Sequence, residues 1–117
     1  MNIRRYRLAL ERTYTDRLTV QRIEKVKVNG ETKQRLVTVY EQQPCRISQK
    51  TLGTNGQTES VNRIAYETKL FAAPELEIKQ GDTLTVTRGQ LTRTYTAGEP
   101  FLYESHQEIS IQRKTEA

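Results

Sequence analysis

The sequence has few of the residues that hold small folds together by covalent bonds or metal ions. It contains one cysteine, Cys45, one histidine, His106, and no tryptophan. A single cysteine excludes an internal disulfide and with it the disulfide-stapled secreted scaffolds. A structural zinc site needs about four Cys or His ligands, which this chain does not have. We therefore expect no metal and no cofactor.

Long apolar runs are also missing. No stretch reaches the roughly 18 apolar residues that span a bilayer, and residues 1–14 carry charge without a signal-peptide core, so we expect no membrane partner. Hydrophobic residues make up 34% of the chain, and exchanging the six tyrosines in that count for the six glycines leaves the fraction unchanged. Soluble domains usually reach about 45–50%. The 117 residues predict a single domain, 1–117, with a thin core that partners help to stabilise.

Recognisable catalytic and nucleotide-binding motifs are absent as well. There is no GxxxxGK[ST], no GxGxxG and no calcium loop of the EF-hand type. A thiol–imidazole pair of Cys45 and His106 would need an orienting third group and an oxyanion pocket, which nothing in the sequence indicates. We expect no enzyme activity. Cys45 is predicted to be a small buried hydrophobe and His106 a hydrogen-bonded strand or rim residue.

The charge that is present is mildly positive. Lys and Arg number 19 against 14 Asp and Glu, which gives a net charge of +5 and a pI near 9.5. This balance favours acidic partners. Much of it lies in the first 22 residues, where Arg4, Arg5, Arg7, Arg12, Arg17 and Arg22 face only Glu11 and Asp16. The cluster suits either a nucleic acid or a helix that docks on protein, and the sequence leaves both open.

The front of the chain predicts a helix. Ile3, Tyr6 and Leu10 recur at helical spacing, so residues 3–11 form a short amphipathic helix with arginines on its other side. A helix this short is marginal alone, and it should dock on the barrel or on a neighbour. The predicted docking segment is 1–15, with Arg4, Arg5, Tyr6, Arg7, Leu10 and Arg12 as its contact residues.

From residue 17 to 114 the hydrophobic period is two, which is typical of strands. The alternating segments from which the strands are expected lie at 18–28, 34–40, 44–48, 63–71, 76–78, 84–88, 91–97 and 105–113. Asn29-Gly30 has the composition of a type I′ hairpin turn, and further turns or loops are expected at 81–82, 89–90 and 98–100. We predict an all-β fold, a small antiparallel β-barrel of about six or seven strands at 17–114, with a short N-terminal helix and one long polar loop.

The long polar loop spans residues 49–63, and only Leu52 and Val61 in it are suited to burial. Loops longer than about 12 residues without their own structure are usually functional or disordered. A plain surface loop and a functional segment both fit.

A barrel that binds single-stranded nucleic acid is a further alternative. Such barrels place aromatic residues on one strand face between basic ones. Arg88 and Arg93 flank a predicted turn, and the tyrosines that could take part are Tyr40, Tyr66, Tyr95 and Tyr103. The same tyrosines also suit positions at the edge of a core.

The succession of segments resembles a known family. A charged N-terminus leads into "YTDRLTVQR" (14–22), and "PCRIS" (44–48), a polar loop, "LEIKQGDTLTVTR" (76–88) and "ESHQEISIQRK" (104–114) follow. This order, over nearly the whole chain, resembles the head-closure or stopper proteins of tailed bacteriophages, and especially small proteins of PBSX-type defective prophages.

The resemblance implies a structural head–tail joining protein. Its relatives form a ring, here expected to be dodecamer-like, beneath the portal and adaptor proteins and above a tail-completion protein. Such a protein would be in the host bacterial cytoplasm during assembly and then at the head–tail interface of the virion. The front arginines would dock on the adaptor or a neighbouring subunit, or contact DNA in the channel without sequence preference.

By the same resemblance, a loop from each subunit closes the DNA channel. On this chain the gating residues would be Gln49, Lys50, Thr51, Leu52, Gly53, Thr54, Asn55, Gly56, Gln57, Thr58, Glu59 and Ser60. A hydrophilic, Gly- and Thr-rich segment of low net charge suits a part that rearranges within a ring.

Overall fold

The computed structural model describes residues 3–51 and 66–114, with the side chains of Thr51 and Tyr66 left out. The elements are α1 (Ile3–Glu11), β1 (Asp16–Val28), β2 (Glu31–Thr51), β3 (Tyr66–Ala72), β4 (Thr83–Arg88), β5 (Leu91–Leu102) and β6 (Gln107–Arg113). The predicted helix at 3–11 is confirmed, with the same bounds.

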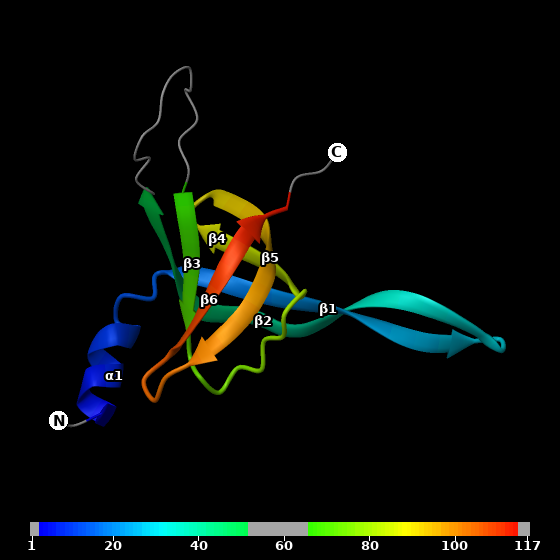
Figure 1. Cartoon of the computed structure of the whole chain (residues 1–117), viewed down its shortest axis with the longest axis horizontal. Helices are drawn as coiled ribbons and strands as arrows, with labels where there is room; N and C mark the ends of the chain where they lie inside the picture. Colours follow the sequence, from blue (N-terminus) through cyan, green and yellow to red (C-terminus); the bar gives the residue numbers. More distant parts are fainter. Residues whose placement is uncertain (1–2, 52–65, 115–117) are drawn as a thin grey trace, which may run out of the picture.

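The six strands form one closed antiparallel barrel in the order β1-β2-β3-β6-β5-β4 (Figure 1). Each strand pairs with both neighbours, so the barrel wall has no free sheet edge. The all-β prediction with one short helix is confirmed.

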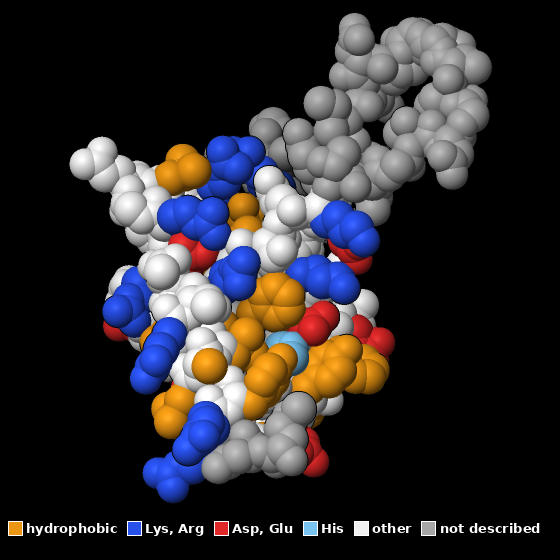
Figure 2. Space-filling view, turned by 90° about the vertical axis from the view of Figure 1, so that its left-hand side faces the viewer, with side chains coloured by type: hydrophobic (Ala, Val, Ile, Leu, Met, Phe, Trp, Pro, Cys, Tyr) orange, Lys and Arg blue, Asp and Glu red, His pale blue; other side chains and the backbone are white. Residues whose placement is uncertain are grey.

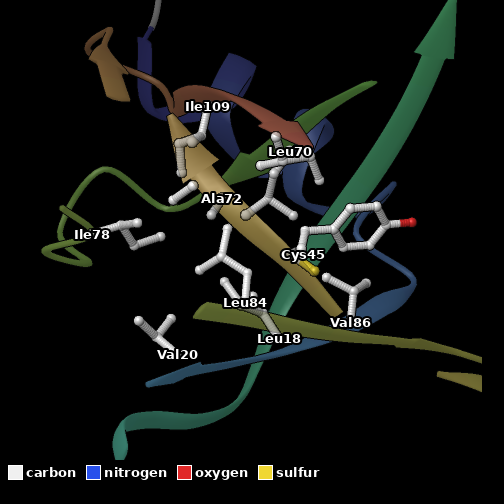
Figure 3. Packing of buried hydrophobic residues seen from close by; sticks show 12 residues of the cluster. Leu18, Val20, Cys45, Leu70, Ala72, Ile78, Leu84, Val86 and Ile109 are labelled. Carbon is white, nitrogen blue, oxygen red and sulfur yellow. The ribbon is translucent and has the colours of Figure 1, made fainter. Parts of the chain in front are cut away.

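Alternating residues of the strands fill the barrel. On β1, Leu18 and Val20 have no exposed surface, whereas Arg17, the residue before Leu18, is exposed. Buried positions also alternate on β4, β5 and β6, and the buried side chains of the strands gather in the barrel interior (Figure 3). The buried cluster is Leu18, Val20, Cys45, Leu70, Ala72, Ile78, Leu84, Val86, Tyr95, Ala97, Ile109 and Ile111.

Strand β2 corrects the sequence-based prediction. The segments 34–40 and 44–48 are parts of one continuous strand. The register with β1 shifts between Leu18 and Val20, and Gln42 on β2 has a φ of 52°. This is a β-bulge, which absorbs extra residues in one strand without ending it.

The long loop also begins later than predicted. Gln49, Lys50 and Thr51 belong to β2 and pair with Thr68, Glu67 and Tyr66 of β3. Three of the proposed gating residues therefore lie in the ladder between β2 and β3. The others, Leu52, Gly53, Thr54, Asn55, Gly56, Gln57, Thr58, Glu59 and Ser60, lie outside the described residues, as does the start of the strand predicted at 63–71.

Two further predictions were wrong. Residues 76–78 form no strand, although Ile78 is buried. They belong to the connection from β3 to β4. Backbone hydrogen bonds from Gly81 and Asp82 to Ala97 hold this connection against β5. Residues 98–100, expected as a loop, form a bulge inside β5. A Cβ atom on Gly98 would stand 2.7 Å from the carbonyl oxygen of Ser110, so the close approach of these strands requires glycine.

Beyond the barrel, β1 and β2 continue as a two-stranded arm, residues 23–36 (Figure 1). Asn29 and Gly30 have φ values of 53° and 82°, as a type I′ turn requires, and this prediction is confirmed.

Candidate functional site

Helix α1 is held loosely at one end of the barrel. None of its residues is buried, and Ile3, Tyr6 and Leu8 are 38%, 47% and 54% exposed. Of the predicted docking residues, Arg4, Arg5, Tyr6 and Arg12 are exposed, and Arg7 and Leu10 are half-buried. The helix thus presents apolar and basic side chains together.

Arg7 is the main anchor of the helix. Its guanidinium donates to Glu11 Oε2 at 2.9 Å and forms a two-point contact with Glu75, on the connection between β3 and β4. The hydrogen bonds from Glu75 and Glu11 raise the pKa of Arg7, and Arg7 in turn lowers the pKa of Glu75. Because both partners are partly exposed, the bridge orients the helix more than it stabilises the fold.

Tyr14 joins the helix to the barrel. It is 8% exposed, and its hydroxyl has no hydrogen-bond partner among the described residues. Burial raises the pKa of Tyr14 to about 12. Beside it a cavity of about 170 Å³ is lined by Glu11, Tyr14, Gln43, Pro44, Ala73 and Leu76.

Asp16 and Arg88 form an ion pair at the opposite end of the barrel, which we call the mouth because β2 ends and β3 begins there. The Asp16 carboxylate is fully buried and accepts from Arg88 at 2.8 and 3.0 Å and from the Ile47 amide at 3.0 Å. Burial alone would raise the pKa of Asp16, but the hydrogen bonds from Arg88 and Ile47 outweigh it and lower the pKa below its ordinary value.

Sequence reasoning missed the role of Asp16, although a signal was present. Asp16 precedes Leu18 and Val20 by steps of two, so it occupies an inward position of β1. A carboxylate at such a position requires a cationic partner.

A second pair fastens the connection from β3 to β4. Arg22 of β1 donates to both carboxylate oxygens of Asp82, at 2.9 and 2.8 Å, and to the carbonyl of Glu77 at 2.9 Å. The Asp82 carboxylate also accepts from the Lys79 amide. Two of the front arginines, Arg7 and Arg22, therefore have structural partners.

Cys45 and His106 do not form a catalytic pair. Cys45 lies in the core, where burial raises the pKa of its thiol to about 12, and a thiolate nucleophile is not formed at neutral pH. His106 stacks on Tyr103 with ring centroids 4.8 Å apart, and its other aromatic contact is Phe71, on the outward face of β3. Both expectations, a buried cysteine and a hydrogen-bonded histidine, are confirmed.

His106 is the centre of an outer patch. Its Nδ1 lies 2.8 Å from Ser105 Oγ and its Nε2 lies 2.9 Å from Glu108 Oε2. Hydrophobic side chains gather around this histidine (Figure 2). Phe101 and Tyr103 of that patch are 62% and 45% exposed. The two hydrogen bonds hold the imidazole ring in the orientation in which Tyr103 stacks on it.

The tyrosines do not share one surface. Tyr95 is buried in the barrel, Tyr103 packs outside against His106, and the Tyr40 hydroxyl accepts from the Glu77 amide at 2.9 Å. Among the described residues they form no row of stacked aromatic rings of the kind that binds single-stranded nucleic acid.

Among the described residues, 3–51 and 66–114, no helix has the length and apolar character of a membrane span. No group of three or more His, Cys, Asp or Glu side chains is placed there to hold a metal ion.

Comparisons with known proteins bear on the fold. No protein-family model and no curated protein sequence matches the chain. A solved structure does: protein xkdH of the phage-like element PBSX from Bacillus subtilis, with a TM-score of 0.51 and 10% identity over 83% of this chain and 91% of that chain. The resemblance drawn from the order of the sequence segments is confirmed at the level of architecture: this chain has the fold of a PBSX prophage protein.

Proposed function

We propose that the protein is a structural component of a tailed phage or prophage that joins head to tail. It assembles as a ring beneath the portal and adaptor proteins, meets the tail-completion protein below, and closes the DNA channel with the segment that follows β2. The observation that carries the proposal is the likeness to PBSX xkdH over most of both chains.

Exposed apolar side chains support assembly with other subunits. Helix α1 presents Ile3, Tyr6 and Leu8, and the arm presents Ile23 and Leu36, which are 60% and 49% exposed and lie opposite each other. Helix and arm project from different sides of the barrel (Figure 1). Two different surfaces that meet head to tail generate a closed ring when the rotation between subunits closes.

Strand β2 supports the position of the gate. Gln49, Lys50 and Thr51 pair with β3, so they provide an ordered base for the segment that follows them in the chain. The gating segment is thereby reduced to residues 52–63, and the three strand residues become its support.

The test of function is deletion of the gene in an inducible lysogen. Packaged heads should then lose their DNA and remain without tails, as counted by electron microscopy of the lysate. Complementation with the wild-type gene should restore filled, tailed particles. Particles that stay filled and tailed in the deletion strain would contradict the proposal.

The test of helix docking is the pair Tyr6→Asp and Leu8→Asp, with Leu102→Asp, an exposed apolar residue of β5 outside helix and arm, as the matched control. The helix variants should lower particle yield by at least tenfold, because a charge replaces an apolar contact. Equal losses in the control would show that the helix face is not a specific contact.

A further inference from the structure

Three strands of the barrel place arginine where the core pattern calls for an apolar residue. On β4, β5 and β6 the buried positions alternate, and the next inward position at the mouth is Arg88, Arg93 and Arg113, respectively. The three side chains line cavities at this end of the barrel. They do not belong to the N-terminal basic cluster.

Two neighbouring cavities open at the mouth, of about 130 and 540 Å³. Gln49, Arg93 and Tyr95 line both, and Arg113 lines the larger one. Among the described residues that line either cavity there is no Asp or Glu. The lining there consists of cationic, neutral hydrogen-bonding and apolar side chains.

The charge in this space is not balanced. Arg88 is neutralised by Asp16, but within the described part of the chain Arg93 and Arg113 have no ion-pair partner. The Nε atom of Arg93 is buried and has no hydrogen-bond partner there either. A buried donor without an acceptor costs about 1–3 kcal/mol, and two neighbouring cations repel each other.

We infer that the barrel mouth is a binding site for a phosphate group, held between Arg93 and Arg113. The guanidinium fork matches two phosphate oxygens, and phosphate supplies the acceptor that Arg93 Nε lacks. Gln49 and Tyr95 line the same space and add neutral donors. A cavity of about 540 Å³ has the size of a small-ligand site, so the phosphate is carried on a larger group, such as a nucleotide or a nucleic-acid backbone.

This inference is independent of the proposed head–tail function, because it rests on the barrel interior alone. The experiment is thermal unfolding of the full chain at constant ionic strength, with millimolar pyrophosphate or matched chloride. A ligand that binds only the folded state raises Tm, by about 5 °C at ten times Kd for a domain of this size.

The variants Arg93→Gln and Arg113→Gln should lose that shift, and Arg35→Gln on the arm, with the same charge change, should keep it. General salting-out by the anion would act equally on all three. A shift that persists unchanged in both mouth variants, or no shift in the wild type, overturns the proposal. If a variant is too unstable for a melting curve, pyrophosphate is titrated into its folded form and binding is followed by ³¹P line broadening. The same two outcomes then decide the proposal.

A second part of the experiment distinguishes the source of the phosphate. A short oligothymidylate that competes with pyrophosphate, with affinity that falls steeply with salt, identifies a nucleic-acid backbone. Competition by a mononucleotide alone identifies a free nucleotide. In both cases the Arg93→Gln variant should bind at least tenfold more weakly.

Discussion

The two halves of the β1–β2 ladder use the same strands for different purposes. In the barrel half, Leu18 and Val20 have no exposed surface. In the arm, Ile23 and Leu36 face each other across the ladder and remain 60% and 49% exposed. Both halves have the antiparallel pairing, so pairing alone does not decide burial.

Closure of the sheet into a barrel explains why apolar residues are buried in one half of the ladder and exposed in the other. Residues 17–21 of β1 pair with β4 as well as with β2, whereas the arm strands pair only with each other. An isolated two-stranded hairpin is marginally stable in water. The arm therefore depends on its turn and on the barrel at its base, and its apolar residues stay exposed.

The largest test of this contrast is Leu18→Ala against Ile23→Ala. We expect Leu18→Ala to cost about 3 kcal/mol, because it removes buried methyl groups and leaves a cavity. Ile23→Ala should cost less than about 0.5 kcal/mol in the monomer. Urea unfolding followed by circular dichroism measures both, and similar losses would show that the arm is part of the core.

The next test compares arginines, Arg88→Gln at the mouth with Arg35→Gln on the arm. The first leaves the buried Asp16 carboxylate without its partner and should cost about 2 kcal/mol, and the second should be nearly neutral.

The cost of Arg88→Gln should depend on pH. The pKa of Asp16 is lowered in the folded protein, so its stabilising effect is present above the unfolded pKa of about 3.9 and is lost as pH falls through the folded pKa. The difference between wild type and variant should therefore shrink below about pH 4. A difference that stays constant from pH 7 to pH 3 would exclude a stabilising charge pair.

The smallest effect is expected from Gly30→Ala at the arm tip. Gly30 has a φ of 82°, where an L-residue costs about 1 kcal/mol. Amide exchange of the arm should become about fivefold faster while barrel amides keep their rates. Equal acceleration in both regions would mean that arm and barrel open as one unit.

Local chemistry made much of this fold predictable. The helix at 3–11, the Asn29-Gly30 turn and the burial of Cys45 follow from spacing, turn composition and alternation, each set by near neighbours in sequence. These features need no knowledge of what the segment packs against.

The errors arose where distant strands decide the local structure. The bulge at Gln42 keeps β2 in the sheet although Pro44 interrupts the pattern, and the bulge at 98–100 keeps β5 in the sheet despite Gly98 and Pro100. Both segments contain turn residues, and only pairing with a distant partner distinguishes a bulge from a turn. The inward arginines were missed because their alternation is visible only once the barrel end is known.

Strand β2 belongs to the barrel at one end and projects from it as part of the arm at the other. It runs from the arm tip to the mouth as one strand of 21 residues, with a length along the bent chain of roughly 65–70 Å. Residues 45–51 pair with β3, and Cys45 pairs with β1 as well, whereas the arm part pairs only with β1. A sideways load on the tip should therefore bend the ribbon first near Gln42, where the register with β1 shifts.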